Sequence, residues 1–183
     1  MFLSSVEIRA AIASGMIRTD PATRADDFRP FGIRLRLGNE LIEPVSSTVA
    51  LDGSRGEAQF RRLSLDESGY FVIHPNSLYL GTTDQSFLLD SCIAGFIDGR
   101  STVARLGLMV HVSSQIFDGA SMNPRTITLE LFNIGPHTLL VKPGEAIGML
   151  SFFRSAKASE DRLVHAQYRD QTEGPLPPRL VGW

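Results

Sequence analysis

Short segments with the alternating pattern of β-strands recur along the chain, and turn residues separate them. In Ile33–Leu37 apolar residues alternate with arginine, and in Ile127–Asn133 they alternate mainly with polar residues. An alternation with a period of two predicts strands that bury one face. The same reasoning predicts further strands at Tyr70–Ile73, Ser77–Thr83, Phe87–Leu89, Leu108–Ser113 and Ala146–Phe153. Many short strands with few helical stretches predict a mainly β fold, either a barrel or a double-sheet jelly roll.

Local signals place one helix and several connections around these strands. Ser4 or Ser5 offers an N-cap for a short amphipathic helix with Glu7 in its first turn, and Gly15 ends that helix. Turns are predicted at Gly38-Asn39 and at residues 142–145, and residues 45–60 predict a hairpin or an ordered surface loop. In the strand predicted at 108–113, one face is expected to carry the apolar residues Leu108, Val110 and Val112.

Composition limits the classes of function. A chain of 183 residues, 43% of them hydrophobic, has the length of one domain with a sizeable core. The net charge of −2 provides no general field that would attract a nucleic acid, so we expect none as a partner. The single cysteine, Cys92, excludes an internal disulfide and suits a reducing compartment. Because neither a signal-peptide pattern nor a run of about 18 apolar residues is found, we expect a cytoplasmic protein without a membrane segment.

The segment Asp98–Val112 concentrates the polar chemistry. It joins a glycine turn, two arginines and two hydroxyl residues to an apolar strand. If Ser101 caps a short helix, the free backbone N–H groups of the first turn favour a phosphate, and Arg105, four residues on, shares the face of Ser101. The alternative is a polar turn in which Ser101 only caps the helix and the arginines are solvated.

The order of the residues in this segment closely resembles the phosphate-binding motif of the dCTP deaminases, which belong to the dUTPase superfamily. The motif reads Asp-Gly-Arg-Ser-Thr-Val-Ala-Arg-Leu-Gly-Leu-Met-Val-His-Val. The resemblance implies a dUTPase-like distorted jelly roll or β-barrel, with a short N-terminal helix and a short helix after the phosphate motif. It also implies that residues 1–155 form a single domain and that residues 156–183 form a C-terminal lid or tail, which we expect to be mobile.

Hydrolytic deamination of cytosine needs an activated water and a group that carries its proton to the base. Zinc deaminases use a His/Cys metal site, which a chain with one cysteine does not supply, so we expect no catalytic zinc. The resemblance implies that Glu130 is the general acid and base, and that Ser101, Arg105 and the backbone carbonyl of Ser114 hold the water near C4. From the residues alone, Glu130 reads as a solvent-facing strand residue. His111 is expected to form a pocket wall or part of the core.

The resemblance also implies a set of contacts to a deoxynucleoside triphosphate. Arg100, Ser101 and Thr102 would receive the phosphates, with Mg²⁺ bound through the triphosphate oxygens. Asp118 would contact the deoxyribose 3′-hydroxyl, although a turn-capping role fits its local sequence equally well. In the tail, the segment Gln167–Gln171 resembles the motif that closes over the nucleotide, and its substrate contacts would be Tyr168 and Gln171.

Several positions depart from the family pattern. Arg34 stands where the first motif usually has an aspartate, so either the local ion pairing is rebuilt or the substrate is handled differently. The segment 119–125 differs from the usual sequence and is longer, and Ile116 and Gln167 replace residues that carry positive charge in some relatives. We hypothesise that Arg125, within the longer loop, restores one positive charge and binds substrate.

These observations predict an enzyme that converts dCTP to dUTP and ammonia. Three alternatives remain open at this point: a dUTPase-type pyrophosphatase, a bifunctional enzyme that releases dUMP, and a non-catalytic nucleotide-binding relative. The resemblance further implies a homotrimer with active sites shared between subunits, and inhibition by dTTP.

Overall fold

A computed structural model describes residues 1–119, 122–159, 168, 171–172 and 174–179. These residues form two α-helices, one short 3-10 helix and twelve strands. The helices are α1 (Ser5–Ala13), η1 (Ala25–Asp27) and α2 (Ser101–Arg105). The strands are β1 (Ile17–Asp20), β2 (Phe28–Arg29), β3 (Gly32–Val45), β4 (Gln59–Arg62), β5 (Phe71–Ile73), β6 (Leu78–Leu89), β7 (Ile93–Gly99), β8 (Leu108–Met109), β9 (Ile116–Phe117), β10 (Arg125–Asn133), β11 (Leu139–Val141) and β12 (Ala146–Arg154).

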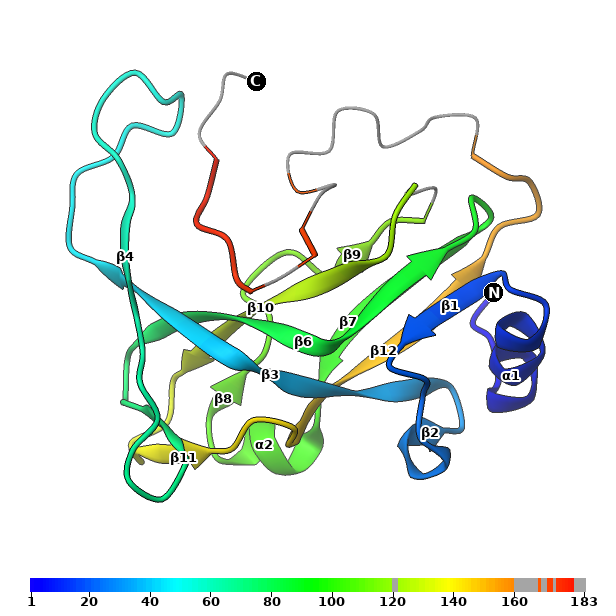
Figure 1. The fold of residues 1–183 in the computed structure, drawn as a ribbon, viewed down its shortest axis with the longest axis horizontal. Coiled ribbons are helices and arrows are strands. Elements are labelled where there is room, and N and C mark those ends of the chain that lie inside the picture. The colour runs from blue at the N-terminus through cyan, green and yellow to red at the C-terminus, as the bar shows by residue number, and fades with distance from the viewer. Residues whose placement is uncertain (120–121, 160–167, 169–170, 173, 180–183) are drawn as a thin grey trace.

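Most of the strands form one strongly curled antiparallel sheet (Figure 1). Its strand order is β8-β10-β6-β3-β12-β7-β9, with β1 paired to β6 and with β2 and β4 paired to β3. The two end strands, β8 and β9, are joined by the short segment 110–115. Its backbone is hydrogen-bonded to β10 and to β7: the Val110 carbonyl accepts from Glu130 N of β10, and the Gln115 carbonyl accepts from Ile97 N of β7. This segment therefore completes the barrel without regular strand pairing.

The predicted alternation is confirmed in the two strands where it is clearest. Ile33, Leu35 and Leu37 of β3 are fully buried. Three apolar residues of β10 are buried with them: Ile127, Leu129 and Leu131. The mainly β fold is therefore confirmed. Among the described residues, no helix combines the length and apolar character that a membrane crossing needs.

The N-terminal helix is also confirmed. Ser4 is the N-cap, and its side chain and that of Glu7 form a reciprocal capping box. Ile8 and Ala11 bury one face of α1 against the core. Gly15, with φ of 78°, follows the C-cap and adopts a conformation that glycine tolerates best.

Two local predictions were wrong. No turn forms at Gly38-Asn39, because β3 continues through it to Val45. The additional β3 residues are absorbed as a bulge opposite Thr82, and Gly38 packs so closely that a Cβ atom there would lie 3.0 Å from the Thr82 carbonyl oxygen. The strand predicted at 108–113 ends at Met109, and Val112 is 50% exposed.

A buried ion pair joins η1 to β3. Asp27 is completely buried and binds Arg36 with both oxygens, at 2.6 Å and 2.9 Å. Arg36 also donates to the Gly144 carbonyl at 2.9 Å, which fixes the predicted turn at residues 142–145. The hydrogen bond to Asp27 raises the pKa of Arg36. Nearby, Arg34 donates to the Asp26 carbonyl at 3.2 Å, so its guanidinium has a backbone partner.

We expect Asp27→Asn to destabilise the fold by about 3 kcal/mol, because it leaves the guanidinium of Arg36 without its buried carboxylate. Asp26→Asn is the matched control: Asp26 is 72% exposed and lies 3.8 Å from the same arginine, so its loss should cost less than about 1 kcal/mol. Urea unfolding of the two variants measures the difference. Equal losses of stability would contradict the assigned role of Asp27.

Candidate active site

One wall of a cavity of about 400 Å³ is formed by the outward-facing residues of β10. Thr126, Thr128 and Glu130 alternate with the buried residues of that strand and all line the cavity. The remaining lining residues come from β4, β6, β7, β9, the rest of β10, the segment before β9 and the tail: Phe60, Leu78, Leu80, Ile97, Ser114, Ile116, Phe117, Arg125, Ile127, Tyr168, Gln171, Leu176 and Pro178.

Glu130 is held by the segment that completes the barrel. Its Oε2 accepts hydrogen bonds from Val112 N at 2.7 Å and from Ser113 N at 3.2 Å. These contacts explain why the strand predicted at 108–113 stops early, since the two amides bind a carboxylate instead of a neighbouring strand. A carboxylate has acceptor capacity on both oxygens, and no hydrogen bond to Oε1 is found among the described residues. Glu130 therefore has one oxygen bound to backbone amides and lines the cavity.

Ser114 lines the same cavity, directly after the two amides that bind Glu130. His111 lies at the start of this segment and is mostly buried. Its Nε2 lies 3.1 Å from the side-chain nitrogen of Gln115 and 4.0 Å from Asp98. His111 does not line the cavity, and its Nδ1 is buried without a hydrogen-bond partner among the described residues, so its place in a pocket wall or in the core stays a prediction.

Arg125, at the start of β10, brings a cation to the cavity. Its guanidinium lies over the Phe117 ring, 4.4 Å from the ring centre, and Nη2 donates to the Asp118 carbonyl at 2.9 Å. Its Nε is buried and has no hydrogen-bond partner among the described residues. Desolvation lowers the pKa of Arg125, and the charge of Asp118 partly offsets this effect. The guanidinium therefore has donor capacity that a bound anion would use.

The tail reaches this cavity through Tyr168 and Gln171. The Gln171 side chain is bound to Thr128 of β10, and the Gln171 backbone carbonyl accepts from Thr126 N at 3.3 Å. Leu176 and Pro178 add an apolar surface. Gln167 of the predicted tail motif lies outside the described residues.

The phosphate motif forms α2, as expected, but the prediction that Ser101 is its cap was wrong. The N-cap is Arg100, without a side-chain capping bond, and Ser101 is the first helical residue. Ser101, Thr102 and Arg105 are exposed to solvent. Arg100 donates to the Ala146 carbonyl, which ties α2 to β12. The first turn thus presents exposed hydroxyl groups with backbone N–H groups, a suitable set of donors for an anion.

The structure brings together only part of the predicted site. Glu130, Ser114, Arg125, Tyr168 and Gln171 surround the cavity. Within this one chain, the predicted residues that do not line it are Arg100, Ser101, Thr102, Arg105 and Asp118. Figure 1 shows α2 at the lower edge of the barrel, whereas the tail crosses the upper part. Asp118 is exposed beside the cavity and contacts Arg125 through its carbonyl.

Sequence reasoning missed several cavity residues. Thr128 lies two residues before Glu130, so the period of a strand places both on one face, and this signal was available. Phe60, Leu176 and Pro178 reach the cavity through long-range packing that no local pattern indicates. Among the described parts of the chain, no group of three or more His, Cys, Asp and Glu side chains is placed to hold a metal ion.

A family model and two relatives found by sequence all relate this chain to dCTP deaminases. A family model described as dCTP deaminase-like matches residues 2–155. The dCTP deaminase of Rhodospirillum rubrum is 35% identical over 193 aligned positions, which cover 99% of this chain and 97% of the relative. The dCTP deaminase of Shewanella loihica is 33% identical, with 94% of this chain and 95% of the relative covered.

Among solved structures, the chain is similar to the crystal structure of 2′-deoxycytidine 5′-triphosphate deaminase from Agrobacterium tumefaciens, with a TM-score of 0.63 and 16% sequence identity. The match covers 84% of this chain and 48% of that protein, so the chain spans about half the length of this structural relative. At this identity the likeness concerns the fold.

Proposed function

The chain belongs to the dCTP deaminase-like family, and from this premise we propose that it is a hydrolase that converts dCTP and water to dUTP and ammonia. The observation that carries the proposal is the position of Glu130 in the cavity. Two backbone amides bind one of its oxygens, Oε2, and the residue lines the cavity in which we place the pyrimidine. This arrangement suits a group that accepts and returns protons at a fixed point.

In the proposed reaction, Glu130 takes a proton from a water molecule as the oxygen of that water bonds to C4 of cytosine. The proton passes to the ring nitrogen N3. Glu130 then carries the proton of the new C4 hydroxyl to the exocyclic amino group, so the C4–N bond breaks, ammonia leaves and C4 becomes a carbonyl. The Ser114 carbonyl is positioned by the segment that binds Glu130, and it would orient the attacking water by accepting its other hydrogen.

We assign Ser101 and Arg105 of a neighbouring subunit to hold the attacking water. In a single chain α2 does not line the cavity of Glu130, and its hydroxyl and guanidinium groups are exposed. A homotrimer in which α2 of one copy completes the cavity of the next would bring both halves together.

The same donors would bind the triphosphate. Arg100, Ser101 and Thr102 provide positive charge, hydroxyl groups and backbone N–H groups, and they supply no carboxylate that would bind a metal directly. We therefore assign Mg²⁺ to the triphosphate oxygens as part of the substrate. Asp118 is proposed to contact the deoxyribose 3′-hydroxyl, and Arg125 to contribute a further cation.

The tail is proposed to act as a lid on a domain formed by residues 1–155. Tyr168 and Gln171 already line the cavity and would enclose the nucleotide. We further propose the cytoplasm as the compartment of this activity, because the only cysteine of the chain, Cys92, is unpaired, which suits reducing conditions.

The first test is Glu130→Gln, which keeps an oxygen for the two amides but removes the proton acceptor. We expect kcat for dCTP deamination to fall by about 10²–10⁴-fold, the usual contribution of general acid–base catalysis. Chromatographic separation of dCTP, dUTP, dUMP and pyrophosphate, in the presence of Mg²⁺, measures the reaction. Unchanged ammonia release by this variant would refute the assignment, and dUMP with pyrophosphate from the wild type would identify the bifunctional alternative.

Sharing of the site between subunits is tested by complementation. Glu130→Gln and Ser101→Ala should each be inactive alone. Mixed oligomers assembled from equal amounts should recover about a quarter of wild-type activity, because a quarter of random neighbouring pairs combine both intact residues. Activity no greater than that of the single variants, in oligomers proven to be mixed, would place both residues in one subunit.

For Arg125, we expect Arg125→Gln to raise KM for dCTP about tenfold, because a hydrogen bond to a charged group is lost. The same variant should leave the weak turnover of deoxycytidine, which has no phosphate, within twofold of wild type. Steady-state kinetics on both compounds, with thermal unfolding as a check on folding, measure this. An equal effect on both compounds would show that Arg125 does not contact phosphate.

A further inference from the structure

The tail and the proposed catalytic glutamate are attached to the same face of one strand. Because side chains alternate along β10, Thr126, Thr128 and Glu130 all point away from the buried row. Gln171 of the tail contacts this face at its centre, at Thr128. The strand that holds Glu130 therefore also holds the tail.

The contact between Thr128 and Gln171 is reciprocal. The Thr128 hydroxyl donates to Gln171 Oε1 at 3.1 Å, and Gln171 Nε2 donates to the Thr128 oxygen at 2.9 Å. A further bond from Nε2 reaches the Gly174 carbonyl, at 3.1 Å, and stays within the tail. The Gln171 side chain thus bonds to the barrel only through Thr128, among the described residues. Because Gln171 is 3% exposed, its amide would be buried without this partner, which is costly.

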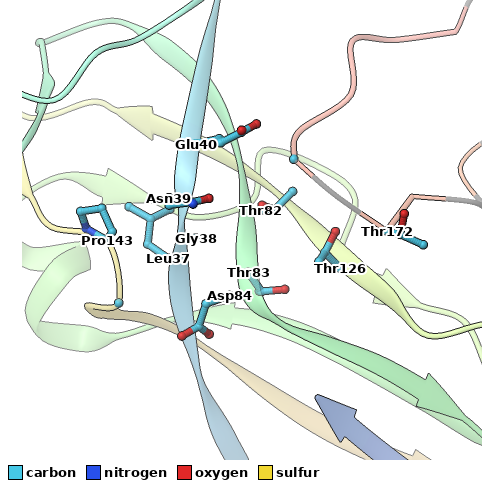
Figure 2. Close-up of a pocket in the computed structure, with 12 residues that line it drawn as sticks. Leu37, Gly38, Asn39, Glu40, Thr82, Thr83, Asp84, Thr126, Pro143 and Thr172 are labelled. Atoms are coloured by element: carbon cyan, nitrogen blue, oxygen red, sulfur yellow. The ribbon is translucent and has the colours of Figure 1, made fainter. Parts of the chain in front are cut away.

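Gly174 of the tail lies beside Glu40 of β3. It has φ of 52°, which favours glycine, and a Cβ atom there would lie 2.5 Å from Oε2 at the end of the flexible Glu40 side chain. Thr126 and Thr172 both line a second cavity of about 500 Å³, together with Glu40 and Gly174 (Figure 2). Gln171 lines the cavity of Glu130, whereas Thr172 and Gly174 line the second cavity. The described tail residues therefore lie against the barrel at both cavities.

Thr126 provides an internal contrast. It has the same side chain, lies on the same face of β10 and also lines the cavity. Its Oγ1 is buried and has no hydrogen-bond partner among the described residues. Its link to the tail uses the backbone alone, through the bond from Thr126 N to the Gln171 carbonyl. The two threonines thus differ in whether the hydroxyl holds the tail.

We propose that Thr128 is a positioning residue that fixes the tail over the active-site cavity through the amide of Gln171. The geometric part of this inference is independent of the reaction, and its kinetic part rests on the proposed function. Loss of the hydroxyl at Thr128 releases the tail and leaves Glu130 bound to its two amides, so substrate affinity falls while the proton-transfer group stays in place.

The test compares Thr128→Val with Thr126→Val. Both variants keep a β-branched side chain suited to a strand and remove one hydroxyl. Hydrogen–deuterium exchange on the full-length protein, without nucleotide, reports docking of residues 171–179. We expect exchange about tenfold faster in Thr128→Val, as the loss of one or two hydrogen bonds implies, and unchanged exchange in Thr126→Val. Thr128→Ser, which keeps the hydroxyl, should restore slow exchange.

Kinetics provide the second readout. We expect Thr128→Val to raise KM for dCTP about tenfold with a smaller effect on kcat, and Thr128→Ser to restore KM. Wild-type exchange rates in Thr128→Val, or equal acceleration in both valine variants, would overturn the proposal. If the wild-type protein does not deaminate dCTP, the proposed function fails, but the exchange data still decide whether Thr128 holds the tail.

Discussion

The bond between the Glu130 carboxylate and the amides of Val112 and Ser113 stands at the point where the sheet lacks a regular strand. The sheet path ends at β8 on one side and at β9 on the other, and the segment 110–115 bridges the gap. Backbone N–H groups in such an irregular segment need acceptors. An ionised carboxylate accepts without donating, so one oxygen of Glu130 satisfies both amides. The group proposed for catalysis is thus placed by the same interaction that completes the barrel.

Side chains replace missing ladder bonds elsewhere in the sheet as well. The register shifts on both sides of β6, against β3 and against β10. At these bulges the Thr83 hydroxyl accepts from Ile127 N at 3.0 Å and donates to the Gln85 carbonyl at 2.6 Å. The Gln85 amide in turn binds the Arg36 and Arg34 backbone of β3. The backbone can therefore depart from regular pairing next to the cavities without leaving these groups unsatisfied.

The features that sequence analysis predicted are those determined by short-range patterns. The capping box of Ser4 and Glu7 and the alternation in β3 and β10 depend on neighbours a few residues apart. The early end of β8 depends on Glu130, which lies some twenty residues further along the chain. The local pattern at 108–113 does not contain this contact, so it predicted a longer strand with Val112 on its apolar face, whereas Val112 is exposed. The bulge at Gly38 likewise depends on Thr82. The motif resemblance proposed candidate site residues, but which of them meet within one chain is a property of the tertiary structure.

The division of the proposed site between two surfaces of one chain has an electrostatic consequence. The α2 surface presents donors and positive charge, and Glu130 lines the β10 cavity. If Arg105 and Glu130 faced each other within one chain, they would form an ion pair, and the carboxylate would bind the guanidinium in place of a water proton. Under the proposed assembly, the two groups meet only across a subunit interface, where the nucleotide and the attacking water occupy the space between them.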